Sequence, residues 1–125
     1  MIDPADVAAV AAYALLHDDL DGRRVDVTGP QSLTQEDMVE VIGEVLGRSL
    51  RCQEIPPAAA RATLTDLGFP PEFADANLAR LATLTDKPAP TTEEVAAILG
   101  RPATTYSSWV AANANAFRRT ATSAD

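Results

Sequence analysis

The chain has 125 residues, which is long enough for a single domain with a buried core, and its 46% hydrophobic and 22% charged residues are typical of a globular protein. The formal net charge of −8 disfavours a nucleic-acid partner, because phosphate backbones are bound by clusters of Lys and Arg. The single cysteine excludes an internal disulfide and a cysteine-based metal cluster. No apolar run is long enough to span a bilayer and no basic signal sequence opens the chain, so we expect a cytoplasmic protein without a membrane partner.

Capping residues predict two helices in the first part of the chain. Asp3 and Pro4 match an N-cap followed by proline at the first helical position, and this helix is expected to run to Leu16. Thr34 and Asp37 match a capping box at the start of a second helix. That helix is expected to end at a Leu-Gly pair, because glycine readily adopts the left-handed conformation that closes a helix.

Two short segments are typical of strands. Residues 24–28 alternate polar and apolar side chains and stop at a Gly-Pro pair, and residues 50–55 end at two prolines. A strand, a helix and a strand in this order predict a right-handed crossover and a parallel pair. Because two short parallel strands make a poor sheet, we expect them to be the remnant of a larger one. Its unpaired edge favours self-association or docking onto another protein.

The rest of the chain is predicted to be helical. Thr91 and Glu94 match a second capping box, and Leu-Gly pairs again mark helix ends. The expected helices span residues 58–67, 71–86, 92–99 and 105–118. Residues 1–118 are therefore expected to form a single α/β domain, mostly helical, with about six helices and two short parallel strands. Residues 119–125 are expected to be a flexible tail.

Several stretches, in order and spacing over nearly the whole chain, resemble the C-terminal part of the NmrA-like branch of the atypical short-chain dehydrogenases/reductases. They are Ile2-Asp3-Pro4-Ala5-Asp6-Val7-Ala8, the run from Gly22 to Pro30, Leu46-Gly47-Arg48, Ile55-Pro56-Pro57, Gly68-Phe69-Pro70-Pro71 and Gly100-Arg101-Pro102. The resemblance implies that residues 24–28 are the last strand of the family's larger sheet. It also implies that the helices from about 58 to 86 form the lobe that closes over a substrate.

Two signatures of cofactor chemistry in that superfamily are missing from this sequence. The Gly-rich turn that holds a dinucleotide pyrophosphate needs a G-x-G pair, and no two of the six glycines make one. The Tyr-x-x-x-Lys pair of many related reductases is absent as well, since no lysine follows Tyr13 or Tyr106 by four residues. We therefore expect a chain that lacks the N-terminal NAD(P)-binding Rossmann half and holds no cofactor or metal of its own. It would not be a self-sufficient oxidoreductase, and NADP would come only with a partner chain.

Three functions remain open at this point. The chain would supply a substrate-binding lobe to a partner Rossmann-type subunit of an oxidoreductase. Alternatively, it would be a stand-alone, non-redox protein that binds a small molecule, or an isomerase or cyclase. The third alternative is a regulatory module that interacts with other proteins. The first two predict an apolar small-molecule ligand, and the unpaired strand edge predicts a homo-oligomer or a Rossmann-type partner subunit.

Four residues are the candidates for binding a substrate: Phe69 in the turn before the predicted helix 71–86, and Phe73, Asn77 and Leu81 on one stripe of that helix. Asn77 places an amide in an otherwise apolar helical stripe, where it would orient a carbonyl or hydroxyl group of a ligand. Phe69 and Phe73 would wall an apolar cavity beside it. The alternatives for Asn77 are a core asparagine bonded to the backbone or a stripe position that reaches water, and the alternative for the two rings is packing in the core.

Other polar residues suit structural roles. Asp3 and Asp6 have the chemistry of an acid–base pair, but helix capping accounts for both positions. His17, followed by two aspartates, is expected to be exposed at a helix end rather than to act as a catalytic base. Cys52 is expected to be buried or half-buried in the second strand. The last helix is expected to carry a docking face formed by Tyr106, Trp109, Val110, Asn113 and Phe117.

Overall fold

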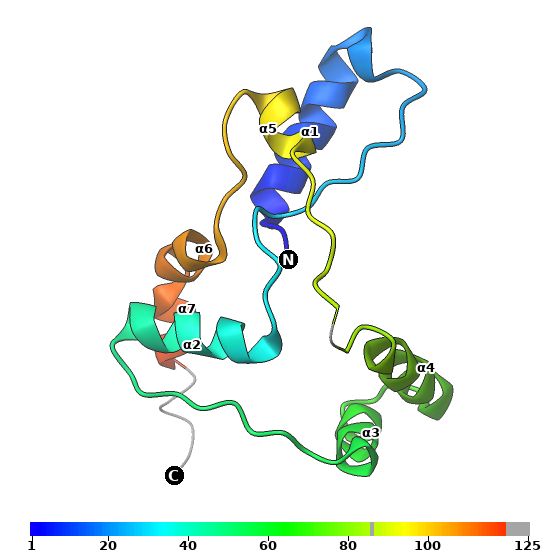
Figure 1. Cartoon of the computed structure of the whole chain (residues 1–125), viewed down its shortest axis with the longest axis vertical. Coiled ribbons are helices and arrows are strands. Elements are labelled where there is room, and N and C mark those ends of the chain that lie inside the picture. The colour runs from blue at the N-terminus through cyan, green and yellow to red at the C-terminus, as the bar shows by residue number, and fades with distance from the viewer. Residues whose placement is uncertain (86, 120–125) are drawn as a thin grey trace. The chain divides into compact units, whose positions relative to one another are not determined.

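The computed structural model describes residues 1–85 and 87–119, and every regular element in this part of the chain is helical (Figure 1). The elements are α1 (Pro4–Leu16), the short 3-10 helix η1 (Asp18–Leu20), α2 (Gln35–Leu46), α3 (Pro57–Asp66), α4 (Pro71–Ala82), α5 (Glu94–Leu99), α6 (Tyr106–Ala112) and α7 (Ala114–Arg119). The predicted α/β class is therefore wrong, because none of the described residues forms a β-strand. No helix within residues 1–85 and 87–119 is long and apolar enough to cross a membrane.

The chain forms two compact units. Unit 1 comprises Met1–Arg51 together with Pro90–Asp125, and unit 2 comprises Cys52–Ala89. The predicted tail begins at Arg119, which is instead the last residue of α7. The rest of that tail, residues 120–125, lies outside the described part of the chain.

The two predicted strands are irregular segments. Residues 24–28 are hydrogen-bonded to a single residue of another segment: the Thr92 hydroxyl donates to the Asp26 carbonyl (2.6 Å), and the Thr92 backbone N–H donates to the Thr28 hydroxyl (2.8 Å). Residues 50–55 have no regular structure either. An alternating pattern specifies which side chains share a face, but a strand also needs a neighbour that supplies its backbone hydrogen bonds. In the described residues no such neighbour is paired with either segment.

Local capping signals position most helix ends correctly. The Asp3 carboxylate accepts a hydrogen bond from the Ala5 N–H (2.8 Å) at the start of α1, and the Thr34–Asp37 capping box is complete at the start of α2. Helix α2 ends at Gly47, which adopts the left-handed conformation with φ of 63°. These predictions are confirmed because they depend only on residues three or four positions apart.

Three helices depart from the predicted pattern. The helix predicted for residues 71–86 ends at Ala82, and residue 86 lies outside the described residues. Helix α5 begins at Glu94 with Glu93 as its N-cap and no side-chain cap, so the predicted Thr91 capping box is wrong. The predicted helix 105–118 is divided at Asn113 into α6 and α7. The Asn113 side-chain amide donates to the Trp109 carbonyl (2.8 Å), and a side chain that bonds the carbonyl four residues back competes with the helical backbone.

In unit 1, helix α1 packs against α5 and α2 packs against α6 (Figure 1). The fully or nearly buried apolar side chains come from these elements and from η1: Val10, Leu20, Val95 and Val110. The larger aromatic side chains of α6 and α7, which are Tyr106, Trp109 and Phe117, are half-buried.

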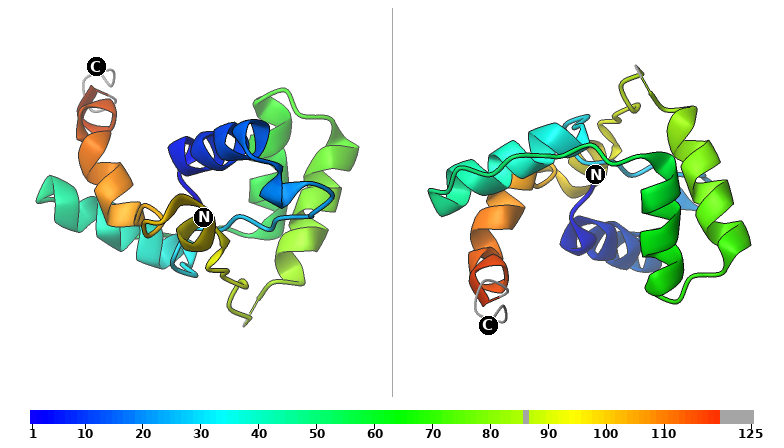
Figure 2. Two further views of the ribbon diagram at one scale, coloured as in Figure 1. Left: turned by 90° about the horizontal axis from the view of Figure 1, so that it is seen from above. Right: turned by 90° about the horizontal axis from the view of Figure 1, so that it is seen from below.

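Unit 2 is a helical hairpin. Helices α3 and α4 lie side by side in both views of Figure 2, and Ala74 of α4 is completely buried. The turn between them contains Gly68, whose φ of 91° lets the Phe69 N–H reach the Leu64 carbonyl (3.1 Å) and close α3. On the outside, Arg61 of α3 makes two hydrogen bonds to the Asp75 carboxylate of α4 (2.6 and 3.2 Å).

Candidate functional site

The four predicted substrate residues all lie in unit 2, on the turn between α3 and α4 and on one stripe of α4. Phe73, Asn77 and Leu81 are spaced by four residues, so they follow one another along the same helical face. Phe69 joins them from the turn, and its ring stacks on that of Phe73 with a centroid distance of 4.9 Å and an angle of 20°. The structure therefore brings together the residues that the sequence suggested.

This stripe is open rather than buried. The exposed fractions of Phe69, Phe73 and Leu81 are 43%, 48% and 38%, which is high for large apolar side chains. Asn77 is half-buried, and its amide has no hydrogen-bond partner among residues 1–85 and 87–119. The structure thus does not show the alternative of a core asparagine bonded to the backbone. Three exposed apolar side chains and one half-buried amide in the same row offer a ligand an apolar surface with a polar group.

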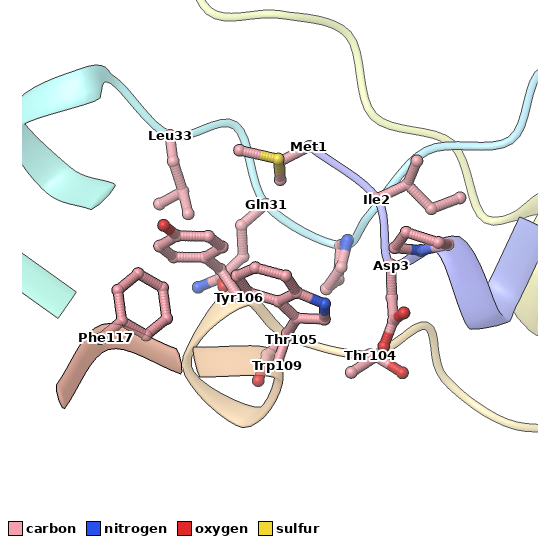
Figure 3. A pocket seen from close by; sticks show the side chains of 12 residues that line it. Met1, Ile2, Asp3, Gln31, Leu33, Thr104, Thr105, Tyr106, Trp109 and Phe117 are labelled. Atoms are coloured by element: carbon pink, nitrogen blue, oxygen red, sulfur yellow. The ribbon is translucent and has the colours of Figure 1, made fainter. Parts of the chain in front are cut away.

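A second candidate region is a cavity of about 330 Å³ in unit 1 (Figure 3). Its walls come from the first residues, from the segment before α2, and from α6 and α7: Met1, Pro30, Leu33, Tyr106, Trp109 and Phe117. The Gly29 N–H donates to the Met1 carbonyl (2.9 Å), which holds the neighbouring Pro30 beside the start of the chain. The sequence predicted that the aromatic residues share a face, but it did not predict that the face borders a cavity.

The aromatic rings of this cavity are arranged against one another. Tyr106 and Trp109 are nearly parallel, with ring centroids 6.0 Å apart and an angle of 15°, and Phe117 meets Trp109 edge-on at 6.2 Å. Figure 3 shows Tyr106 and Trp109 next to each other at the centre, with Leu33 and Met1 above them. Edge-on and offset contacts of this kind are favourable between aromatic rings. They keep the rings in place without filling the cavity.

A buried carboxylate holds one wall of this cavity to α1. Asp6 is only 1% exposed, and its Oδ2 accepts a hydrogen bond from the Thr104 N–H (2.7 Å) while its Oδ1 lies 2.8 Å from Arg101 Nη1. Burial acts to raise the pKa of Asp6, but the hydrogen bonds from Thr104 and Arg101 outweigh it and lower this pKa below its usual value. The side chain was interpreted from the sequence as a capping acid, and no local pattern indicates partners almost a hundred residues away.

The remaining candidates from the sequence do not form a catalytic group. His17 is exposed, its ring stacks on Tyr13, and its Nδ1 lies 3.0 Å from the Tyr13 carbonyl. The Tyr13 hydroxyl donates to the Asp19 carboxylate (3.1 Å), which raises the pKa of Tyr13. Cys52 is exposed, so the prediction of a buried thiol is wrong, because the strand that would have covered it does not form. No three or more His, Cys, Asp or Glu residues gather as metal ligands in the described part of the chain.

Comparisons of the sequence and of the structure with known proteins both match the chain to reductases. No model of a protein family matches the chain. The chain is 38% identical over 117 residues to the (4-alkanoyl-5-oxo-2,5-dihydrofuran-3-yl)methyl phosphate reductase of Streptomyces griseus, and 35% identical over 118 residues to the NAD(P)H azoreductase of Xenophilus azovorans. Each match covers 93% of this chain and 41% of the relative. The chain thus spans less than half the length of the curated relatives it matches.

The fold agrees with these matches. The Citrobacter sp. triphenylmethane reductase complexed with NADP(H) superposes with a TM-score of 0.71 and 18% identity, over 90% of this chain and 39% of that one. These relatives are reductases, and the chain corresponds to about two-fifths of the length of each. The matches are consistent with the C-terminal part of an NmrA-like reductase.

Proposed function

We propose that this chain is the substrate-side part of an NAD(P)H-dependent reductase whose dinucleotide site is formed by a Rossmann-type partner subunit. The single observation that supports this proposal is the match to two reductases at 38% and 35% identity across 93% of the chain, but over only 41% of each relative. Redox chemistry in such an enzyme needs both a dinucleotide and a substrate surface. The proposal assigns the substrate surface to this chain.

The proposal places no phosphate site at the N-termini of α1, α2 and α6. A pyrophosphate binds where free backbone N–H groups meet the positive end of a helix. Here the first turns of α1, α2 and α6 are capped by the side chains of Asp3, Thr34 and Thr105. Helices α1 and α2 also carry acidic residues in their first turns, which would repel a phosphate. We therefore derive no cofactor-binding step from these residues.

The proposed role of unit 2 is to receive and orient a flat, conjugated molecule. The stacked rings of Phe69 and Phe73 offer an apolar platform, and Leu81 extends it by one side chain. The free amide of Asn77 would hydrogen-bond to a carbonyl oxygen or azo nitrogen of the ligand and fix its orientation. The names of the relatives, which describe an oxo-dihydrofuran, an azo compound and a triphenylmethane as substrates, are consistent with this chemical class.

A chimera tests this proposal. The matched segment of the Xenophilus azovorans azoreductase is replaced by residues 1–118 of this chain, and NAD(P)H consumption is followed with azo, triphenylmethane and unsaturated-lactone substrates. We expect NAD(P)H-dependent reduction with a substrate preference different from that of the parent azoreductase. The azoreductase without the segment is the control, and it should bind no substrate. A folded chimera that binds NADPH but reduces none of the three classes would contradict the proposal.

A second measurement uses the chain by itself. Calorimetric titration with NADPH should show no tight stoichiometric binding, because the phosphate site is assigned to the partner. Tight binding of one NADPH per chain would overturn that assignment, whatever the result with the chimera.

A further inference from the structure

The cavity of unit 1 has the size and lining of a small-molecule site. Its volume of about 330 Å³ lies at the lower end of the range for ligand pockets, which are mostly apolar with a few polar groups. Three aromatic rings and the side chains of Leu33 and Met1 supply the apolar surface (Figure 3). The cavity is separate from the stripe of Phe69 and Phe73, because it is lined only by residues of unit 1.

Two hydrogen-bond donors in this cavity are free. Within residues 1–85 and 87–119, neither the Trp109 indole N–H nor the Tyr106 hydroxyl has a hydrogen-bond partner. Partly buried Trp and Tyr side chains usually find a partner for these groups. Both belong to rings that line the cavity and both are accessible to solvent, so an acceptor on a bound molecule can replace water as their partner. The Gln31 amide, which also lines the cavity, provides a further polar contact.

The charge of the lining does not favour an ionic ligand. The charged groups of the lining residues are the Asp3 carboxylate and the α-amino group of Met1, and no Lys or Arg side chain takes part. One oxygen of the Asp3 carboxylate already accepts the Ala5 N–H as a helix cap, so this group serves the fold. One charge of each sign leaves the lining without a net charge that would attract an anion or a cation. An uncharged ligand with a hydrogen-bond acceptor meets all of these conditions.

We propose that this cavity binds an uncharged, planar aromatic ketone or a closely related conjugated carbonyl compound. The ring of the ligand packs against Trp109 and Tyr106, and its carbonyl oxygen accepts a hydrogen bond from the indole N–H, the phenol O–H or both. This site does not depend on the proposed reductase role, since none of its residues belongs to unit 2. It gives the chain a small-molecule binding function of its own.

The test exploits the fact that Trp109 is the only tryptophan in the chain. Its side chain gives a single indole N–H signal in a proton–nitrogen correlation NMR spectrum of the full chain. Acetylnaphthalene is the neutral probe, and naphthoate and naphthylmethylammonium are matched anionic and cationic probes with the same ring. We expect acetylnaphthalene to shift the indole signal saturably, together with the backbone amides of Thr104 and Thr105. Naphthoate should bind about tenfold more weakly, because moving its charge from water into a mostly apolar cavity costs free energy.

Conservative variants separate the site from non-specific binding. Trp109→Phe and Tyr106→Phe keep an aromatic ring but remove one donor each, and at least one of them should weaken acetylnaphthalene binding about fivefold. Leu15→Ala is the matched control, because Leu15 is an apolar side chain of unit 1 that is 86% exposed and does not line the cavity. Phe73→Ala should leave the affinity unchanged, which separates this site from the proposed substrate surface.

Three results would overturn the proposal. The first is an indole signal that does not move up to the solubility limit of the probe. The second is unchanged affinity in both donor variants, and the third is an equal loss in Leu15→Ala. The backbone amides of Val10 and Val95 report on the core of unit 1, so a variant that has unfolded is recognised and excluded before its affinity is compared.

Discussion

Asp6 and Thr104 are joined by a hydrogen bond of 2.7 Å between the carboxylate Oδ2 and the backbone N–H, across 98 positions of the sequence. The same carboxylate pairs with the Arg101 guanidinium. Through these two contacts the first turn of α1 holds the segment that leads into α6. The segment in turn carries Thr104 and Thr105, which line the cavity of unit 1. A single buried charge therefore links the start of the chain to its candidate ligand site.

Replacing this charge should destabilise unit 1 strongly at neutral pH. We expect Asp6→Asn to lower the free energy of unfolding by about 2–4 kcal/mol, because Arg101 loses its partner and the buried hydrogen bond to Thr104 is weakened. Urea unfolding followed by Trp109 fluorescence measures this change in unit 1. Asp21→Asn, which removes an exposed acid, is the control and should have little effect.

The effect of Asp6 should also depend on pH with a defined sign. The pKa of Asp6 is lower in the folded chain than its ordinary value of 3.8, so the folded state favours the ionised form. Its stabilising contribution is complete above the unfolded pKa and is lost as the pH falls through the lower, folded pKa. The difference in unfolding free energy between wild type and Asp6→Asn should therefore shrink in acid below about pH 4. A difference that stays constant down to pH 2 would contradict this assignment.

Two glycines of unit 1 should respond differently to alanine. A Cβ at Gly29 would overlap the Met1 carbonyl oxygen, and that oxygen is backbone that cannot rotate away. Gly22 has a φ of 71°, but nothing lies near the position of its Cβ. We expect Gly29→Ala to cost roughly 1–3 kcal/mol or more through overpacking, and Gly22→Ala to cost about 1 kcal/mol through backbone conformation alone. Thermal unfolding of the two variants side by side measures the contrast, and equal costs would refute the close approach at Gly29.

The two capping boxes suggested by the sequence should behave unequally. Thr34→Ala should lose about 1 kcal/mol of stability, because the Thr34 hydroxyl accepts the Asp37 N–H (3.1 Å) at the start of α2. Thr91→Ala should be close to neutral, since α5 begins at Glu94 without a side-chain cap. Chemical unfolding of both variants provides the measurement. A similar loss in both would mean that the second box does form in solution.

A last prediction concerns substrate binding in the azoreductase chimera and depends on the proposed function. Phe73→Ala should raise KM for a conjugated aromatic substrate about tenfold and change kcat little, because the ring contacts ground state and transition state alike. Leu67→Ala is the matched control: Leu67 is 70% exposed and does not belong to the stripe. Steady-state kinetics of both variants measure KM and kcat for this substrate. An equal rise of KM in the two variants would show that the stripe is not the specific contact surface for the substrate.

Signals carried by neighbouring residues were sufficient to predict much of this protein. The caps at Asp3 and Thr34 and the glycine that closes α2 depend on groups within one helical turn, and each lies where the sequence indicates. The stacked pair of Phe69 and Phe73 is equally local, because a short turn and a spacing of four residues bring the rings together. The order of short motifs also predicted the similarity to reductases that the comparisons found.

Tertiary structure alone decided the absence of the predicted strands, the burial of Asp6 and the cavity of unit 1. The physical reason is the same in each case. A strand is stable only with a partner that supplies backbone hydrogen bonds, so the alternating residues 24–28 are bound by Thr92 instead of forming a ladder. The burial of Asp6 depends on Arg101 and Thr104, and the cavity of unit 1 depends on Met1 meeting the rings of α6. Such contacts join residues that are far apart in the chain, and no periodicity or capping rule encodes which of them will meet.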